Sequence, residues 1–411
     1  MPFAVKVILV LLSVILLEIY FVKRVVNSIK FIFPKFSDRK IKVGKWIFLT
    51  LVNIYPIIAI TAWIYVLLNN IGYFQPPENI FFDYFVLYPF WVGTIIIVQS
   101  TLFFLLLEIL HLMILPFIKN VKPKINRIKS ALFFVIFICA FIYVPFRIIY
   151  DYKSVEINEV SFYKEEIPES LNGFKIAFIS DIQADRYTDE KRLTNFIEKV
   201  NSTNPDLILM AGDMITSTPD YIEFSAHQLS KLKSKYGIFT CVGDHDNWAY
   251  RGDNKRSLKE VTIALNKVNI PMIDNNKLHL GIDGANIEVS FITNTYVEKA
   301  SENILDSLTK NNTKADLRIF LTHQPMEFLI KKAEEKNFDL FLAGHTHGGQ
   351  ITFLFPFINL SPTQIETPYM RGEFKFGKTL MVVTRGLGMS LAPVRYNSTP
   401  EITIIKIKSK S

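Results

Sequence analysis

The sequence predicts a membrane protein in two parts, a group of helices over residues 1–150 and an α/β domain over 151–411. Half of the 411 residues (50%) are hydrophobic, which is high for a soluble chain of this size. Long apolar runs dominate the first part, whereas apolar and charged stretches alternate in the second. The second part therefore has the pattern of a globular domain.

Four apolar runs in the first part are long enough to cross a hydrocarbon core of ~30 Å, which needs about 20 helical residues. They are Pro2–Val22, Trp46–Leu68, Tyr84–Ile109 and Ala131–Ile149. The first run could instead be a signal peptide. It has no small-residue cleavage site, however, and it continues directly into Lys23 and Arg24, so we expect a membrane span there as well.

Lysine and arginine are unevenly distributed among the loops. They are frequent in 23–45 and 119–129 and absent from 69–83. Because basic loops stay in the cytoplasm, we expect both termini and the C-terminal domain to be extracytoplasmic. These loops also account for the net charge of +8, since residues 151–411 are nearly neutral. The charge therefore predicts contact with anionic membrane lipids and no nucleic-acid partner.

Cys139 and Cys241 are the two cysteines, so no disulfide framework is indicated.

Two ionisable residues of the third run bear on a role beyond anchoring. Glu108 and His111 lie three residues apart near the cytoplasmic end of the third run. Such residues are functional candidates, but a pair satisfied by hydrogen bonds or water near the interface is the simpler explanation. Four spans without a Gly/Pro break at mid-span favour anchoring over transport.

Five short runs rich in isoleucine, leucine and phenylalanine predict buried strands. They are Phe174–Ser180, Asp206–Gly212, Tyr236–Gly243, Leu317–His323 and Phe338–Gly344. Between them, segments such as Asp189–Asn201 and Pro325–Glu335 are polar on one side, as surface helices are. This alternation predicts an α/β layered fold, and such sheets place ligands at the carboxyl ends of their strands.

Every predicted strand ends in residue types that bind metals. The residues at these ends are Asp181, Asp213, Asp244, His245, Asp246, His323, His345 and His347. Two divalent ions about 3.5–4 Å apart need a bridging carboxylate, further Asp and His ligands, and open positions for water and phosphate. The pattern therefore predicts hydrolysis of a phosphate ester with two divalent ions.

These blocks resemble the calcineurin-like metallophosphoesterases, whose ordered pattern is Asp-x-His, Gly-Asp, Gly-Asn-His-Asp/Glu, His and Gly-His-x-His. The resemblance covers roughly 171–408. Two segments, GHTHGGQI (Gly344–Ile351) and RGLGMSLAPVRYNSTPEITIIKI (Arg385–Ile407), resemble the membrane-anchored or exported bacterial branch typified by YkuE. The resemblance implies a four-layer α/β/β/α sandwich and hydrolysis by a hydroxide between two ions.

The resemblance also implies a metal role for each matching residue. Asp181 and His347 would bind the first ion, and Asp213 would bridge the two. His323 and His345 would bind the second ion.

Three further roles follow from the same resemblance. His245 would be the acid that steadies the leaving-group oxygen, and Asp246 would orient its ring. Arg385, which opens the C-terminal tail, would bind the substrate.

Two positions depart from the family pattern. Gln183 stands where the first block has histidine, and Asp244 stands where the third has asparagine. Both substitutions raise the oxygen share of the ligands, which favours Mn²⁺ or Mg²⁺ over Fe or Zn²⁺. Asp185 is a nearby side chain that could replace Gln183 as a ligand. Three interpretations remain open: an active, retuned two-metal site, a site with one tight and one loose ion, and a pseudo-enzyme that binds a phosphorylated ligand.

The segment Ile351–Met370 follows the Gly-His-Thr-His block and carries Phe353, Phe355 and Phe357 at alternate positions. It could receive an acyl chain or enter the bilayer interface, or it could form one buried face of a strand. Membrane attachment favours a lipid or cell-envelope phosphodiester or pyrophosphate as substrate over a phosphorylated small molecule.

Overall fold

The computed structural model describes residues 3–69, 77–117, 122–250, 252–311 and 314–410, with the side chains of 3–11 left out. The chain divides into two compact units. The first comprises Met1–Ile149 together with Phe353–Leu360. The second comprises Tyr150–Thr352 and Ser361–Ser411.

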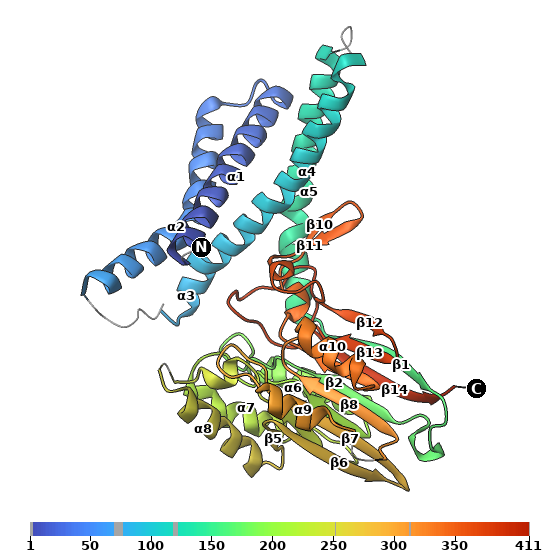
Figure 1. The fold of residues 1–411 in the computed structure, drawn as a ribbon. Helices are drawn as coiled ribbons and strands as arrows, with labels where there is room; N and C mark the ends of the chain where they lie inside the picture. The colour runs from blue at the N-terminus through green and yellow to red at the C-terminus, as the bar shows by residue number, and fades with distance from the viewer. Residues whose placement is uncertain (1–2, 70–76, 118–121, 251, 312–313, 411) are drawn as a thin grey trace. The chain divides into compact units, whose positions relative to one another are not determined.

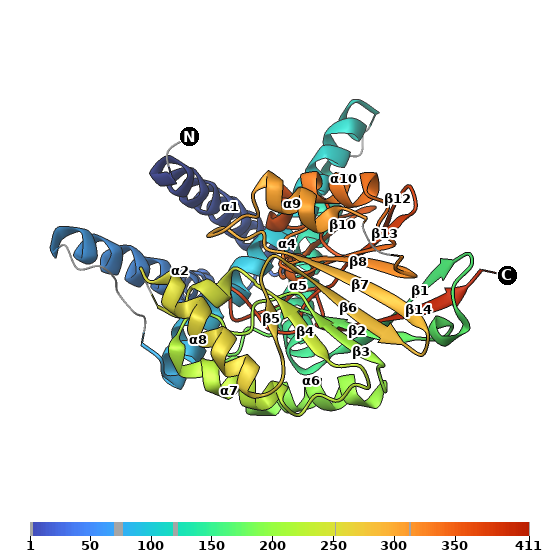
Figure 2. The ribbon, with the colours of Figure 1, turned by 60° about the horizontal axis from the view of Figure 1, so that its bottom comes forward.

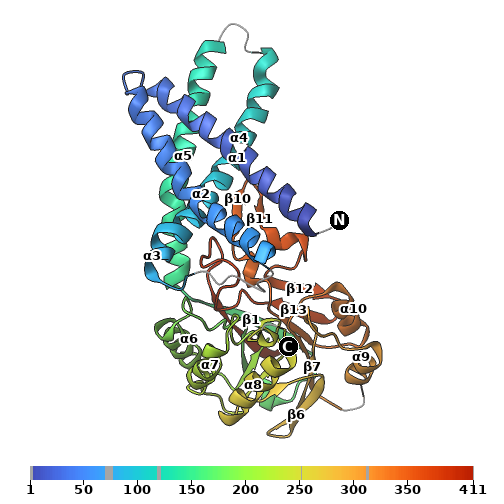
Figure 3. The same ribbon diagram turned by 90° about the vertical axis from the view of Figure 1, so that its left-hand side faces the viewer.

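The first unit consists mainly of long helices, which Figure 3 shows. They are α1 (Phe3–Ile32), α2 (Asp38–Asn69), α3 (Ile80–Phe82), α4 (Tyr88–Ile114) and α5 (Lys122–Lys153), with a π-helical turn (Asp83–Leu87) between α3 and α4. Within the described residues, three segments are long and apolar enough to cross a membrane: Asp38–Asn69, Ile80–Ile114 and Pro123–Lys153. The first half of the predicted span Pro2–Val22 lies outside the residues whose side chains are described.

Glu108 of α4 joins three helices of this unit. Its carboxylate lies 2.7 Å from the guanidinium of Arg24 in α1 and 3.2 Å from Nζ of Lys129 in α5. The carboxylate thus pairs with these two basic groups within the bundle, which agrees with the simpler explanation. A structural role explains Glu108.

A short hairpin completes the first unit. Strand β10 (Phe353–Phe355) pairs antiparallel with β11 (Ile358–Leu360), and the hairpin lies beside α4 (Figure 1). Phe357 at its turn is fully exposed, while Phe353 and Phe355 are only partly buried. The segment therefore does not form one buried face of a strand.

Among the described residues, the second unit contains two six-stranded mixed sheets (Figure 2). The first has the order β1-β14-β2-β3-β4-β5, with bounds Glu156–Lys164, Glu401–Ser409, Lys175–Ile179, Leu207–Met210, Ile238–Cys241 and Met272–Ile273. The second has the order β12-β13-β9-β8-β7-β6, with bounds Gly372–Phe376, Thr379–Val383, Leu340–Ala343, Leu317–Thr322, Ala285–Ile292 and Asn276–Ile282. The five predicted strands are β2, β3, β4, β8 and β9, and within each sheet they pair in parallel.

Five helices cover the outer faces of these sheets. They are α6 (Glu190–Ser202), α7 (Ile222–Leu229), α8 (Asn254–Lys267), α9 (Glu302–Thr309) and α10 (Glu327–Glu335). The two predicted helices are confirmed as α6 and α10. Helix α6 begins after Asp189 because the Asp189 side chain accepts the N–H of Arg192 (3.0 Å), which satisfies a free donor of the first turn.

Side chains of successive strand residues enter different cores. Ile176 and Phe178 join the core between the two sheets, whereas Ala177 and Ile179 join the core under α6, α7 and α8. Phe320 of β8 enters a third core, under α9 and α10. Because strand side chains alternate between faces, these three cores separate four layers. The expected four-layer α/β/β/α sandwich is confirmed.

Candidate metal centre

The turns after β2 and β3 run side by side and bring two carboxylates together. The N–H of Asp181 donates to the carbonyl of Gly212 (3.0 Å), and the N–H of Gln183 donates to the carbonyl of Asp213 (2.9 Å). The strand pairing thus continues past the strand ends. Asp181 and Asp213 both lie there, fully buried.

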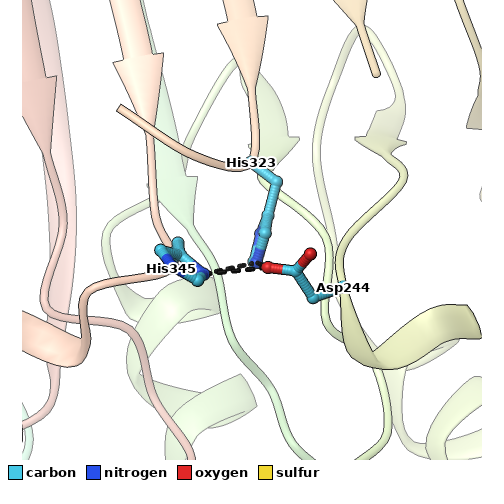
Figure 4. Close-up of side chains that lie close together, drawn as sticks. All are labelled: Asp244, His323 and His345. Carbon is cyan, nitrogen blue, oxygen red and sulfur yellow. Dashed lines mark hydrogen bonds and ion pairs between the residues drawn. The ribbon is translucent and has the colours of Figure 1, made fainter. Parts of the chain in front are cut away.

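Three further candidates converge from the ends of β4, β8 and β9, as Figure 4 shows. Oδ2 of Asp244 lies 3.2 Å from Nε2 of His323 and 3.0 Å from Nδ1 of His345. The two ring nitrogens are 3.3 Å apart. One ligand atom from each of the three residues lies within 4.8 Å of the others, so together they could hold one metal ion.

A second group of ligand atoms shares His323 with the first. It consists of Asp181, Asp213 and His323, again within 4.8 Å of one another, and Nε2 of His323 lies 3.4 Å from Oδ2 of Asp213. Nε2 of His347 lies 3.5 Å from Oδ1 of Asp181. The structure thus brings five of the predicted ligands into two adjoining groups, with His347 beside one of them.

Two buried oxygen atoms in this centre have no hydrogen-bond donor among the described residues: Oδ1 of Asp181 and Oε1 of Gln183. The amide Nε2 of Gln183, in contrast, has a hydrogen-bond acceptor, since it donates to Oδ2 of Asp213 over 2.7 Å. A buried acceptor without a donor is destabilising unless a cation satisfies it. These two atoms show that the residues fit divalent metal ions.

The backbone is strained at the same positions. Five candidate ligands that are not glycine have positive φ: Asp181 (51°), Gln183 (48°), Asp213 (61°), His345 (69°) and His347 (48°). Each such residue costs roughly 1–3 kcal/mol, and such strain concentrates at functional sites. Gly344 is required beside them, because a Cβ there would lie 2.7 Å from Oδ2 of Asp181.

Burial and neighbouring charged groups shift the pKa values of several candidate ligands. Burial raises the pKa of Asp181. Burial also opposes ionisation of Asp213 and Asp244, but the neighbouring His323 outweighs it and holds the pKa of both carboxyls below the usual range. Burial lowers the pKa of His347 well below its usual value, which leaves its imidazole neutral and able to bind a cation.

His245 lies next to these groups with both ring nitrogens engaged. Nδ1 bonds to the carbonyl of Thr216, and Nε2 lies 3.0 Å from Oγ of Ser390. Its backbone N–H donates to Oδ1 of Asp213 (2.8 Å). The Thr216 carbonyl therefore orients the ring.

Asp246 has a different contact set from the one expected. Its carboxylate accepts the backbone N–H groups of Asp213 (3.0 Å), Met214 (2.8 Å) and Gly243 (2.8 Å). Burial and the Asp213 charge still raise its pKa to about 6. Asp246 thus ties the turns after β3 and β4 together, and its predicted role of orienting the His245 ring is corrected in favour of Thr216.

Asp185 is not placed to substitute for Gln183. Its Oδ1 accepts the N–H groups of Tyr187 and Thr188 (2.7 Å each), and its Oδ2 accepts the hydroxyl of Thr216 (3.0 Å). Oδ1 stabilises the turn after β2, and Oδ2 ties it to the turn after β3. Asp181 and Gln183 remain the candidate ligands in the turn after β2.

Two arginines of the C-terminal tail have contrasting surroundings. Arg385 pairs with Glu401 (2.6 Å) and Glu156 (2.7 Å), and its role toward substrate stays a prediction. Arg395, which the sequence reasoning missed, is fully buried and donates to the carbonyls of His347 (3.2 Å) and Gly388 (2.9 Å). The sequence signal that could have pointed to Arg395 is an arginine within an apolar tail. Burial lowers its pKa to about 9.

Glu366 and Tyr296 also escaped prediction. Oε1 of Glu366 lies 3.1 Å from Nε2 of His345 and accepts the Tyr296 hydroxyl, while the Tyr296 N–H donates to Oδ1 of Asp244 (2.6 Å). Burial opposes the charged form of His345, but Asp244 and Glu366 outweigh it and raise the His345 pKa to about 9. Glu366 thus fixes the ring so that Nδ1 faces the other ligands.

Comparison with known proteins agrees with this geometry. Residues 174–349 match the family model of the calcineurin-like phosphoesterases. The chain is 30% identical over 261 residues to the uncharacterized metallophosphoesterase YkuE of Bacillus subtilis, which covers 62% of this chain and 86% of that protein. It is 32% identical over 263 residues to the uncharacterized metallophosphoesterase Cj0846 of Campylobacter jejuni, covering 63% of this chain and 65% of that protein. The chain therefore belongs to the calcineurin-like metallophosphoesterases.

A further relative bears on the membrane. The chain is 27% identical to a zebrafish (Danio rerio) transmembrane protein with a metallophosphoesterase domain, over 62% of this chain and 57% of that protein. Together with the three candidate spans, this relative indicates a membrane protein. The match spans less than two thirds of the Campylobacter and zebrafish proteins.

Proposed function

We propose that this protein is a membrane-anchored, metal-dependent phosphoesterase that hydrolyses a phosphate ester or pyrophosphate of a lipid or cell-envelope substrate. The observation that carries the proposal is a pair of buried acceptors that receive no hydrogen bond from the described residues, Oδ1 of Asp181 and Oε1 of Gln183. They lie in a strained centre rich in carboxylates and imidazoles. Such a centre is unfavourable without cations.

The residues that would hold two divalent ions come from both sheets. They are Asp181, Gln183, Asp213, Asp244, His323, His345 and His347. Bound divalent ions supply Lewis acidity toward the phosphoryl group and acidify water. The predominance of oxygen donors supports Mn²⁺ or Mg²⁺.

His245 would deliver the proton that the leaving group needs. The Thr216 carbonyl accepts from Nδ1–H, so His245 would act as the doubly protonated imidazolium, whose second proton lies on Nε2 beside the Ser390 hydroxyl. From Nε2 the proton passes to the leaving-group oxygen as the P–O bond breaks. The alcohol then leaves neutral.

The experiment is hydrolysis of a chromogenic phosphodiester by the purified full-length protein, stripped of metal and reloaded with Mn²⁺, Mg²⁺, Fe²⁺ or Zn²⁺. We expect activity only after reloading. Tight binding of inorganic phosphate by the reloaded protein, without turnover of monoesters, diesters or pyrophosphates, would instead identify a phosphoryl-ligand binding protein.

A further inference from the structure

The hairpin β10–β11 belongs to the helical unit although it follows the candidate ligands in the sequence. Phe353 comes six positions after His347, yet Phe353–Leu360 groups with Met1–Ile149. Gln99 of α4 explains this grouping. Its Nε2 donates to the carbonyl of Leu354 (2.8 Å), and its Oε1 accepts the N–H of Leu354 (2.9 Å). The side-chain amide pairs with the hairpin as a neighbouring strand would.

This double hydrogen bond matters because of where Gln99 lies. It belongs to the candidate span Ile80–Ile114 and is 4% exposed. In hydrocarbon, an amide side chain and the outer backbone groups of a hairpin are strongly unfavourable unless they bond to one another. The pairing satisfies the amide group of Gln99 and the backbone groups of Leu354 together. The hairpin can therefore dock against the candidate span beside Gln99.

The docked hairpin borders an open groove of about 250 Å³, which we term the hairpin groove. Its lining includes Gln99 and Phe103 of α4, Cys139, Ala140 and Tyr143 of α5, and Leu354 of β10. Within the described part of the chain, the atoms that this lining exposes are all apolar. Small-molecule sites usually have roughly 300–1,000 Å³ and a few polar groups. The hairpin groove is smaller and offers none, so it suits a single flexible hydrocarbon chain.

We infer that the hairpin groove binds one acyl or alkyl chain of the lipid whose phosphate group is hydrolysed. The inference rests on the proposed function and specifies its substrate class, a long-chain lipid phosphate ester. Three observations support it: the groove is apolar, it is built on candidate membrane spans, and its hairpin is continuous with the candidate ligand His347. The seven residue-to-residue steps from His347 to Leu354 reach at most about 25 Å, which is of the order of one lipid's length.

The test compares two substrates with one leaving group, hexadecyl p-nitrophenyl phosphate and ethyl p-nitrophenyl phosphate. Hydrolysis of either ester consumes water, breaks the P–O bond to the aryl group and releases p-nitrophenol. Each buried methylene favours binding roughly fourfold, so the full-length protein should prefer the hexadecyl ester in kcat/KM. The measured quantity is the ratio of the two kcat/KM values.

Ala140→Phe fills the groove, because Ala140 is 6% exposed and lines it. Loss of two or more buried methylenes should lower the hexadecyl-to-ethyl ratio at least about tenfold. Ala131→Phe is the matched control, since Ala131 lies on the same helix and outside the groove, and it should keep the wild-type ratio. A ratio unchanged in Ala140→Phe would overturn the inference.

Cys139 allows the same test without a bulky mutation. Hexyl methanethiosulfonate should attach a short chain to Cys139, which is exposed, and dithiothreitol should remove it. Cys241 does not compete, because it is fully buried and burial raises its thiol pKa. We expect a reversible fall in the ratio for a protein whose single adduct is verified by mass, and no fall in Cys139→Ser treated in parallel. An equal fall for both esters contradicts the inference.

Binding of radiolabelled hexadecyl phosphate separates failure of this inference from failure of the proposed function. If the metal-loaded protein hydrolyses neither of these diesters, nor a monoester or a pyrophosphate, the proposed function is wrong. The groove is then judged by binding alone, which Ala140→Phe should weaken and Ala131→Phe should not. Equal binding by the two variants would refute the groove whatever the activity.

Discussion

Gln183 donates its amide Nε2 to Oδ2 of Asp213 over 2.7 Å and keeps its own Oε1 buried without a donor among the described residues. Gln183, one of the two residues that depart from the family pattern, therefore contacts the carboxylate expected to bridge the two ions. It also presents a free oxygen to the same centre. We propose that Gln183 is a ligand retuned from nitrogen to oxygen, which would account for both features.

Gln183→Ala should weaken the first ion selectively, by about 10–100-fold in affinity, the range found for groups that support a metal site. Gln183→His should instead tighten Zn²⁺ relative to Mn²⁺, because imidazole is the softer donor. Competitive metal titration measures both effects. Gln228→Ala on α7 is the matched control. Unchanged affinity in both Gln183 variants would leave Asp181 as the ligand of this turn and favour a site with one tight ion.

His245→Ala should retain the metals and lower turnover by about 10²–10⁴-fold, the usual contribution of a positioned acid. The loss should be smaller for esters with good leaving groups, which need less protonation. Steady-state kinetics with leaving groups of graded pKa checks this. His227→Ala changes an exposed histidine of α7 and should have no effect. Loss of metal in His245→Ala would contradict the assignment.

Metal binding should release protons. His345 has a pKa of about 9 in the metal-free protein, so its imidazole is protonated at neutral pH, and a cation must displace that proton. Apparent affinity should therefore rise about tenfold per pH unit for each proton displaced, up to about pH 9. Glu366→Gln removes one of the charges that raise this pKa. Calorimetry in buffers of different ionisation enthalpy should show fewer protons released by that variant.

The distribution of basic residues predicts the sidedness of the membrane unit. Reporters fused after Lys408 or inserted at Pro77 should behave as extracytoplasmic, and one at Lys40 as cytoplasmic. Alkaline phosphatase and green fluorescent protein fusions measure the two sides. A cytoplasmic signal from the Lys408 fusion would mean that one of the four predicted spans does not cross the membrane.

The parallel strands that carry the site could be predicted because they are buried on both faces. Runs such as Ile176–Ile179 and Leu340–Ala343 are continuously apolar and are followed two residues later by a ligand type, so strand and site share one signal. The outer strands β1 and β12 lack this continuous apolar pattern, since polar and apolar residues alternate there. Their pairing is set by tertiary contacts that the sequence does not display locally.

The contacts made by residues around the candidate ligands could not be predicted from the sequence. Asp246 and Glu366 act through contacts with groups far away in the chain, Met214 and His345, and neither contact has a spacing rule. Thr216 contributes a backbone carbonyl, which no residue type encodes. The Gln99–Leu354 pairing joins residues 255 positions apart, so the docking of the hairpin could not be inferred from the phenylalanine pattern.

The most direct test of the account is metal content measured together with phosphodiester hydrolysis for the wild-type protein and Asp213→Asn. A neutral amide cannot bridge two cations as a carboxylate does. We expect about two divalent ions per wild-type chain, with activity that depends on them, and loss of both metal and activity in Asp213→Asn. Asp220→Asn, an exposed aspartate outside the site, should match the wild type. An Asp213→Asn protein that keeps its metal and its activity would contradict the two-metal centre.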